Sequence, residues 1–418
     1  MEITKIDPNF VLPGAVQKDD IVWLNAASAP FVIYGAVGTN PYARIPMEVA
    51  QTVSEGVQVL CTHTAGIRAR FCTDSPYIAI RAEWNTQCRM PHMPFLGISG
   101  FDLYRVSGAH RKQSYVASLT PPVSCENGYE AIAYVGGGMK EYVLNFPLYN
   151  DVSRLLIGVA EGSQWQAPQP YANALPTIFY GSSITQGGCA SRPGTCYQNF
   201  LSRALDMDYV NLGFSGNCRA EDTMIDYLAS LEMSAFVSDY DHNAPTAEHL
   251  AATHEKLYRA IRKAHPQVPY VMLSKPDYHD TPDERARRSI VMQTYQKAVA
   301  EGDPNVYFVD GASIFAGDES DGCTVDGCHP TDLGFYRFYR ALLPVFERLD
   351  LRSRCLVDLV KIAVQPALGQ NRRVRSLSVL FQESQSHLTV LPDCVVRLLG
   401  QLQVRDLYSV LCPVSQRH

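Results

Sequence analysis

The most informative segment of this sequence is Thr177-Ile178-Phe179-Tyr180-Gly181-Ser182-Ser183-Ile184-Thr185. Its first four residues form a short apolar run with the β-branched and aromatic content of a buried strand. A glycine followed by serines is typical of a turn, and serine is a preferred residue at a helix N-cap. The stretch therefore predicts a strand, a tight turn and the start of a helix.

The same order of an apolar run and a helical pattern recurs as far as residue 348. The predicted strands are 177–180, 209–212, 235–238, 270–273 and 306–309. The predicted helices are 195–205, 220–231, 247–263, 284–300 and 333–348. Five such alternations predict a three-layer α/β/α domain over residues 175–350, with a five-stranded parallel sheet covered by helices on both faces. Ligands of such sheets bind at the carboxyl ends of the strands.

Residues 1–165 have a different texture, with short runs in which apolar and polar residues alternate. Ile78 and Ile80 fall on one face of such a run, and Arg81 and Glu83 fall on the other. Period-two alternation broken by Gly and Pro predicts a β-sandwich accessory domain. Three glycines at 136–138 lie between two predicted strands, and a hairpin turn is preferred over a glycine-rich oxyanion loop as their interpretation.

Two further segments divide the chain. Residues 161–176 have the Gly, Pro and Gln content of a linker. Residues 351–418 contain one Phe, one Tyr and no Trp, which is too few aromatic residues for a dense core. They are interpreted as a C-terminal appendage whose order the sequence leaves open and which takes no part in the chemistry.

The composition is that of an ordinary globular protein and excludes some partners. Hydrophobic residues make up 46% of the chain, charged residues 19%, and the formal net charge is −6. An acidic balance argues against partners with dense negative charge, so neither a nucleic acid nor a membrane surface is expected. No stretch approaches the roughly 20 apolar residues of a membrane span. The oligomeric state is left open.

The N-terminus and the cysteines bear on location. Residues 1–16 lack the basic region and apolar run of a secretory signal. The 12 cysteines are spread thinly along the chain and are interpreted as buried thiols rather than as a disulfide framework. A cytoplasmic location is expected, although a secreted chain from which the signal had been removed would look the same.

Ser183 is the candidate nucleophile. A serine between a strand and a helix stands at the carboxyl edge of the sheet, where its own N–H can help to hold an anion. A hydroxyl nucleophile needs a base, and the base needs a carboxylate that orients it. Asp326 and His329 are three residues apart after the last predicted strand, and Pro330 favours an extended His329. These three residues are predicted to form a catalytic triad.

Gly216 and Asn243 follow the second and third predicted strands, at the same edge of the sheet. A glycine N–H and an asparagine amide are suitable donors for an oxyanion, so both are candidates for an oxyanion hole together with the N–H of Ser183. Each is also compatible with a simple turn or cap. His242 and His279 follow the third and fourth predicted strands and are candidates for the substrate cleft.

A zinc site at Cys323, Cys328 and His329, with Cys189, Cys196 or Cys218 nearby, is the competing interpretation of the last loop. Cys-x4-Cys-His is not a usual spacing for structural zinc, and the chain contains no Cys-x-x-Cys pair. No metal and no organic cofactor are therefore expected.

Together these segments resemble the SGNH (GDSL-type) hydrolase family, whose ordered blocks supply Ser, Gly, Asn and Asp-x-x-His. The resemblance covers about residues 175–350 and implies a flavodoxin-like catalytic domain. The first block has Ser182 where the family commonly has Asp, and the third reads Asp-His-Asn-Ala where Gly-x-Asn-Asp is usual. The matching positions are Ser183, Gly216, Asn243, Asp326 and His329.

A second resemblance concerns the N-terminal region. The stretch Gly100-Phe101-Asp102-Leu103-Tyr104 is similar to the Gly-x-Asp-Leu-Tyr motif of the β-domain that precedes a subset of SGNH esterases. This implies a jelly-roll-like domain packed against the catalytic one. For Asp102, a structural role within the sandwich is preferred over a place in the substrate cleft.

The resemblance implies a serine esterase that removes small acyl groups, in particular acetyl groups, from carbohydrate. The expected substrate is a small-molecule or oligosaccharide ester. A short-chain lipase or thioesterase is the alternative enzyme. A carbohydrate-binding protein without activity is the alternative from another class, but such a protein has no need of an intact Ser and Asp-x-x-His set.

Overall fold

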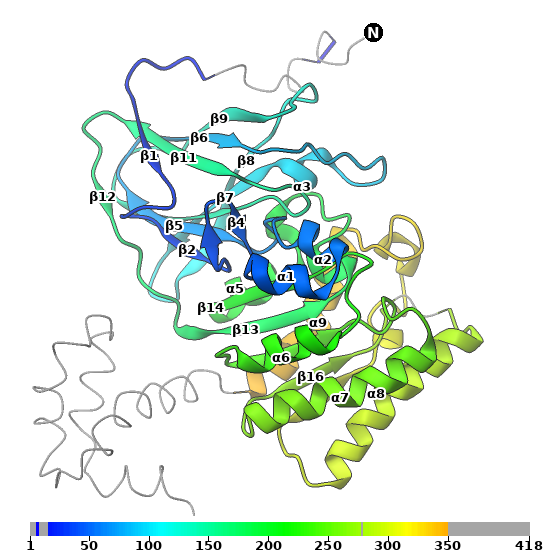
Figure 1. Ribbon diagram of the computed structural model, residues 1–418. Helices are drawn as coiled ribbons and strands as arrows, with labels where there is room; N and C mark the ends of the chain where they lie inside the picture. The colour runs from blue at the N-terminus through cyan, green and yellow to red at the C-terminus, as the bar shows by residue number, and fades with distance from the viewer. Residues whose placement is uncertain (1–5, 8–15, 277–278, 350–418) are drawn as a thin grey trace, which may run out of the picture. The chain divides into compact units, whose positions relative to one another are not determined.

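The computed structural model describes residues 6–7, 16–276 and 279–349 (Figure 1). These residues belong to a compact unit that ends at Leu349. The appendage predicted at 351–418 lies outside the described residues. Within the described residues, no helix combines the length and the apolar character that crossing a membrane requires.

The N-terminal region consists of two antiparallel β-sheets with a shared core. The first sheet has the order β1-β11-β6-β9. Its strands are β1 (Ile21–Asn25), β6 (Tyr77–Glu83), β9 (Gly128–Tyr134) and β11 (Arg154–Ala160). The second has the order β12-β5-β10-β7-β8, with β2 paired to β5. Its strands are β2 (Val32–Tyr34), β5 (Arg68–Thr73), β7 (Phe101–Ser107), β8 (Lys112–Leu119), β10 (Lys140–Asn145) and β12 (Trp165–Gln166).

The alternation seen in the sequence matches the two faces of the first sheet. Ile78 and Ile80 of β6 are fully buried in the core between the sheets. Arg81 points away from that core and pairs with Glu130 on the neighbouring strand β9. Two further short strands, β3 (Gly38–Thr39) and β4 (Tyr42–Ala43), pair with each other.

The interpretation of residues 136–138 as a hairpin turn is wrong. The loop joins β9 to β10, but β9 pairs with β6 in the first sheet whereas β10 pairs with β5 and β7 in the second. The N–H groups of Gly136 and Gly138 donate to the carbonyls of Pro76 and Asp74, at 3.1 and 3.2 Å. The glycines therefore form a connection between two sheets, and their positive φ angles of 67° and 90° explain the residue type.

The predicted five-stranded parallel sheet is confirmed. Its order is β14-β13-β15-β16-β17, which is the flavodoxin-like order 2-1-3-4-5. The strands are β13 (Asn173–Gly181), β14 (Met207–Gly213), β15 (Ala235–Asp239), β16 (Tyr270–Leu273) and β17 (Val306–Val309). Strand β13 pairs with β14 on one side and with β15 on the other, so the chain changes direction across the sheet at this strand. A ligand site is expected in the crevice at the carboxyl end of such a strand.

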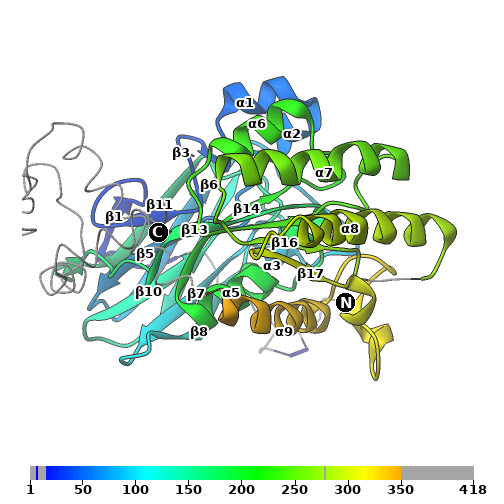
Figure 2. The same cartoon turned by 90° about the horizontal axis from the view of Figure 1, so that it is seen from below.

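Helices cover both faces of this sheet (Figure 2). One face carries α5 (Tyr197–Leu205) and α9 (Asp332–Arg348). The other carries α6 (Asp222–Ser230), α7 (Ala247–Ala264) and α8 (Pro282–Ala300). Threonine side chains cap α7, α8 and α9, which explains where these helices begin. Short helices α1 (Met47–Val53) and α2 (Glu55–Leu60) of the N-terminal region lie next to α6.

Asp102 of the Gly-x-Asp-Leu-Tyr stretch connects the N-terminal region to the parallel-sheet region. Its carboxylate is fully buried and accepts hydrogen bonds from Asn145 Nδ2, Arg192 Nη1 and the N–H of Gly194, each at 2.8 Å. Burying a carboxylate is costly unless it is paired, and here the guanidinium of Arg192 supplies the pairing charge. Asp102 therefore has a structural role and fastens the loop before α5 to β7 and β10.

Candidate active site

Ser183 is the first residue of the short helix α4 (Ser183–Gln186), directly after β13. The helix is capped by Ser182, whose hydroxyl accepts the N–H of Ile184 at 3.1 Å. It ends at Gly187, which has a φ of +108° and therefore favours glycine. This turn places Ser183 at the carboxyl edge of the sheet with only 6% of its surface exposed.

His329 and Asp326 lie in the loop that precedes α9. The loop closes on itself because the N–H of Val325 donates to the carbonyl of His329 at 2.9 Å. Oδ1 of Asp326 accepts the N–H groups of Cys328 and His329, at 3.1 and 2.8 Å. Oδ2 of Asp326 lies 2.8 Å from His329 Nδ1, and His329 Nε2 lies 2.9 Å from Ser183 Oγ. The structure thus joins the three residues predicted as a triad into one hydrogen-bonded chain.

The hydrogen bonds around Asp326 keep its carboxylate charged. Partial burial by itself would raise the pKa of Asp326, but the N–H and the imidazole of His329 and the N–H of Cys328 lower it to about 2. A carboxylate that is charged at every ordinary pH holds the Nδ1–H tautomer of His329, which leaves Nε2 to accept a proton from Ser183.

The triad opens into a cavity of about 480 Å³ at the carboxyl edge of the sheet. Residues that line it are Ser183, Ser215, Gly216, His242, Asn243, Lys275, Asp283, Glu284, Arg287, Cys328 and His329. The three oxyanion donors predicted from the sequence therefore border the same space. Gly216 has a φ of +67° with open space at its Cβ position, so its residue type is explained by backbone conformation alone.

The two histidines predicted for the cleft differ in position. His242 lines the cavity, its side chain is only 9% exposed, and its Nε2 bonds to Ser182 Oγ at 2.7 Å. His279 is not among the described lining residues. Its N–H donates to Glu284 Oε2 at 2.7 Å, and its Nε2 lies 3.4 Å from the carbonyl of Gly327.

Two residues that shape the loop after β14 were missed by the sequence reasoning. The fully buried guanidinium of Arg44 donates to the carbonyls of Asn211 and Gly213, at 2.9 and 2.7 Å. Oε1 of Gln186 accepts the N–H of Ser215 at 3.0 Å. Both hold the backbone that carries Gly216. No sequence pattern signals either contact. Arg44 belongs to the N-terminal region, far along the chain from the loop that it holds.

The described residues contain two groups whose donor atoms lie close enough to bind a metal. In one group, ligand atoms of His92, Cys189 and His329 lie within 4.8 Å of one another. Burial raises the pKa of the Cys189 thiol to about 12, with Asp326 and Cys328 adding to the effect, which disfavours the thiolate that a metal needs. The other group is Asp239, Asp241 and His242.

Chelators are expected to leave activity unchanged, because both nitrogens of His329 are engaged in the triad. The measurement is ester hydrolysis after prolonged incubation with EDTA and with o-phenanthroline. Loss of activity that added zinc restores would contradict this expectation and would make the first group a metal site.

Asp239, at the end of β15, is a buried carboxylate next to the nucleophile turn. Its Oδ2 accepts the hydroxyl of Thr185 at 2.8 Å, and Oδ1 has no hydrogen-bond partner among the described residues. Burial raises the pKa of Asp239 from 3.8 to about 6, against the opposing effects of His242 and Thr185. The folded protein therefore binds this proton more tightly than the unfolded chain does. The resulting stability is full below about pH 4 and is lost as the pH rises through 6.

Asp239→Asn is expected to remove this pH dependence, because an amide can still accept the Thr185 hydroxyl but carries no charge. When the pH is raised from 4 to 8, the wild type should lose about 1–3 kcal/mol of unfolding free energy that the variant does not lose. The size follows from the pKa shift, since two pKa units correspond to roughly 3 kcal/mol. Urea unfolding of both proteins at the two pH values measures the difference. Parallel changes in the two proteins would contradict the assignment.

Comparison with known proteins agrees with this architecture. Residues 174–347 match the GDSL-like lipase/acylhydrolase family, and residues 21–165 match the Gly-x-Asp-Leu-Tyr N-terminal region of SGNH-hydrolase-type esterases. No curated protein matches the chain.

Solved structures with the same fold are also found. A GDSL-like lipase from Bacteroides ovatus is 25% identical, with a TM-score of 0.70 over 79% of this chain and 98% of that chain. The salicylyl-acyltransferase SsfX3 from a tetracycline biosynthetic pathway is 19% identical, with a TM-score of 0.63 over 78% and 96%. A family two carbohydrate esterase from Cellvibrio japonicus is 12% identical, with a TM-score of 0.52 over 79% and 98%.

Proposed function

Since the chain belongs to the SGNH (GDSL-type) esterases and carries their Gly-x-Asp-Leu-Tyr N-terminal domain, we propose that it hydrolyses small acyl esters of carbohydrate through Ser183, His329 and Asp326. The observation that carries this proposal is the continuous hydrogen-bonded chain from Asp326 through His329 to the hydroxyl of Ser183, in which His329 and Ser183 line the cavity. A serine activated in this way is the nucleophile of acyl transfer.

The first half of the reaction acylates Ser183. His329 Nε2 takes the hydroxyl proton while Oγ attacks the ester carbonyl carbon, and the carbonyl electron pair moves onto oxygen. The N–H groups of Ser183 and Gly216 and the amide of Asn243 stabilise this oxyanion. When the tetrahedral intermediate collapses, the alcohol oxygen leaves and takes the proton from Nε2, so that an acyl-enzyme remains on Ser183.

The second half returns the enzyme to its starting state. A water molecule gives its proton to His329 Nε2 and attacks the acyl carbon, which forms a second oxyanion in the same hole. Collapse releases the carboxylic acid, and the proton on Nε2 returns to Ser183 Oγ. Asp326 remains charged throughout and stabilises the imidazolium that forms in each half.

The walls of the cavity support a small acyl group on a polar alcohol. Among the described lining residues there is no Ala, Val, Leu, Ile, Met, Phe, Tyr or Trp, so a long acyl chain would find no hydrophobic side chain to pack against. The charged lining residues are paired: Lys275 Nζ lies 2.6 Å from Glu284 Oε1, and Arg287 Nε lies 2.6 Å from Asp283 Oδ2. Such a wall is close to neutral yet rich in donors and acceptors, which suits the hydroxyl groups of a sugar.

A substrate panel tests this assignment. Acetylated oligosaccharides are compared with p-nitrophenyl esters whose acyl chain grows from acetyl to octanoyl. We expect kcat/KM to fall roughly 10-fold or more as the acyl chain lengthens, because each added methylene must enter a polar space. Release of acetate from the oligosaccharides identifies the sugar ester as substrate. Equal or rising kcat/KM with chain length would contradict the proposal and favour a lipase.

Asn243→Ala is expected to lower kcat by roughly 10²- to 10³-fold with a smaller effect on KM. The reason is that the amide of Asn243 would donate mainly to the oxyanion, which exists only in the transition state and the intermediate. Steady-state kinetics on p-nitrophenyl acetate measure both constants, and an unchanged melting temperature shows that the variant is folded. A rise in KM alone would make Asn243 a residue for binding the substrate ground state.

A further inference from the structure

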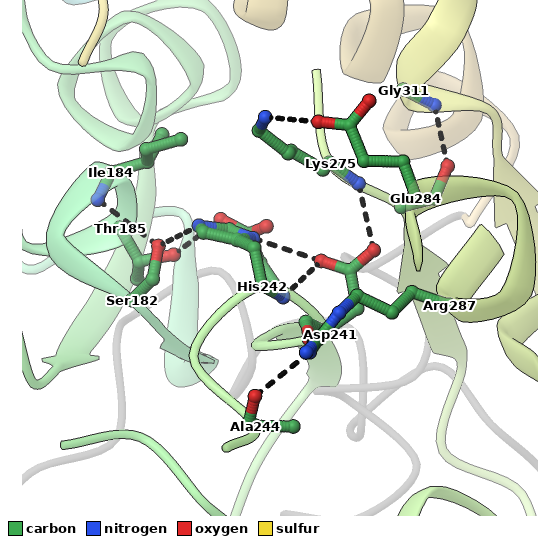
Figure 3. A network of polar contacts seen from close by, with 12 residues as sticks. Ser182, Ile184, Thr185, Asp241, His242, Ala244, Lys275, Glu284, Arg287 and Gly311 are labelled. Carbon is green, nitrogen blue, oxygen red and sulfur yellow. Dashed lines mark hydrogen bonds and ion pairs between the residues drawn. The ribbon is translucent and has the colours of Figure 1, made fainter. Parts of the chain in front are cut away.

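A second Asp-His-Ser chain lies beside the first one. Asp241 Oδ1 is 2.8 Å from His242 Nδ1, and His242 Nε2 is 2.7 Å from Ser182 Oγ (Figure 3). The order of groups, from carboxylate to Nδ1 and from Nε2 to a serine hydroxyl, is the same as in the chain from Asp326 through His329 to Ser183. The two chains therefore end on consecutive serines of the same turn.

Burial separates the roles of the two chains. Ser182 has no exposed surface, whereas Ser183 borders the cavity. The hydroxyl of Ser182 is also engaged as the cap of α4, where it accepts the N–H of Ile184. Side chains of Asp241 and His242 are 2% and 9% exposed. Ser182 is therefore out of reach of an ester carbonyl and is not a second nucleophile.

The positions of the bonded residues suggest what the second chain does. Ser182 immediately precedes Ser183, and His242 immediately precedes Asn243. The bond between Ser182 and His242 thus joins the backbones that carry two of the three proposed oxyanion donors. Helix α4 has only four residues, so its own hydrogen bonds hold it weakly and an outside anchor matters.

Asp241, at the other end of this series of hydrogen bonds, is held by contacts of its own. Oδ2 of Asp241 accepts the N–H of Lys275 at 3.0 Å, two residues after β16. Arg287 Nη1 donates to the carbonyls of Asp241 and Ala244, at 2.6 and 2.8 Å, and so holds the loop that contains His242 from the side of α8 (Figure 3). These contacts fix the loop after β15 to the neighbouring strand and to a helix.

The charged groups around His242 support a persistent bond to Ser182. Burial by itself would lower the pKa of His242, but Asp241 and, further away, Asp239 raise it above its usual value against the opposing charge of Lys275. Neutral His242 accepts the hydroxyl proton of Ser182 at Nε2, and the imidazolium donates to the same oxygen. The bond therefore survives in either protonation state.

We propose that His242 is a positioning residue that links Ser182 to Asp241 and thereby sets the distance between the oxyanion donors on Ser183 and Asn243. The inference rests on the proposed function. It predicts that loss of the bond to Ser182 lowers transition-state stabilisation and leaves substrate binding nearly unchanged, since a shift of about 1 Å in a catalytic group can cost about 10²-fold.

Two substitutions of His242 separate its two bonds. In His242→Asn the amide reaches the position of Nδ1, so it keeps the contact with Asp241 and loses the one with Ser182. In His242→Gln the amide reaches the position of Nε2 and keeps the contact with Ser182. We expect kcat to fall by roughly 10- to 100-fold in His242→Asn and to stay within roughly 5-fold in His242→Gln, with KM little changed in both.

A matched control and a double variant complete the design. His265, half-buried at the end of α7, bonds to the carbonyl of Ala229 at 2.9 Å outside the cavity lining. His265→Asn is expected to lower the melting temperature without changing kcat. In an Asn243→Ala background, His242→Asn should cost clearly less than in the wild type, because the donor that it positions is already absent.

The outcomes distinguish this inference from the proposed function. Labelling of Ser183 by a fluorophosphonate and hydrolysis of p-nitrophenyl acetate by the wild-type protein test the proposed function. If the wild type shows neither, the proposed function and the inference are both overturned. With an active, labelled wild type, equal kcat values for His242→Asn and His242→Gln would overturn the inference alone. A change in KM without a change in kcat would overturn it as well.

Discussion

Ser183→Ala is expected to lower kcat on p-nitrophenyl acetate by between about 10³- and 10⁶-fold while the protein stays folded. Alanine has no atom that can attack a carbonyl. In the variant, the proposed oxyanion donors can assist only the direct attack of water on the ester. The fold should tolerate the change because Ser183 Oγ bonds to His329 Nε2 at the cavity and the cap of α4 is the neighbouring Ser182.

Ser183→Ala is measured by steady-state kinetics together with the mass of the protein after treatment with a fluorophosphonate. Wild-type protein should gain one adduct on the peptide that contains Ser183, and the variant should gain none. Ser313→Ala is a suitable control, because Ser313 is exposed and its hydroxyl donates to the carbonyl of Asp310, away from the lining of the cavity. Turnover close to that of the wild type in the Ser183 variant would remove this residue as nucleophile.

Asp326→Asn is expected to lower kcat by about 10⁴-fold, because it imposes the wrong tautomer on His329. Oδ1 at this position accepts the N–H groups of Cys328 and His329, so the oxygen of an asparagine amide would occupy the same place. The NH₂ group would then face His329 Nδ1 and require it to be an acceptor. The ring proton moves to Nε2, which can no longer take the proton of Ser183.

Kinetics across pH test this explanation for Asp326. The pKa of about 2 means that titration of Asp326 should produce no loss of wild-type activity above about pH 3. Asp318→Asn, an exposed aspartate earlier in the same connection, serves as a control that should retain full activity. A loss of less than about 10-fold in Asp326→Asn would show that His329 is oriented by another group.

Secondary structure in the parallel-sheet region followed from local patterns. Strands β16 and β17 have the predicted bounds residue for residue, and β15 differs by one residue, because a buried parallel strand is a short run of apolar residues between polar turns. Helices α7, α8 and α9 begin directly after a capping threonine, which places their first residues within two positions of the predicted ones. Such features depend on neighbours in the sequence.

The glycines at 136–138 show where local patterns fail. A hairpin turn and a loop that connects two sheets both need residues with positive φ, so three consecutive glycines are equally compatible with the two structures. The choice depends on which strands pair with β9 and β10, and those partners lie tens of residues away.

Local patterns in the sequence were enough to predict the fold class and the residues of the candidate triad, since a nucleophile, a base and a carboxylate must be particular residue types at the carboxyl ends of strands. How these side chains meet depends on contacts between residues far apart in the sequence. His329 and Ser183 are 146 residues apart, Arg44 and Asn211 are 167 apart, and His242 and Ser182 are 60 apart. The contact between Ser182 and His242 depends on the strand order, which places β13 beside β15. The contact of Arg44 depends on how the N-terminal region packs against β14. Strand order and packing involve residues from the whole domain, so no short stretch of sequence contains them.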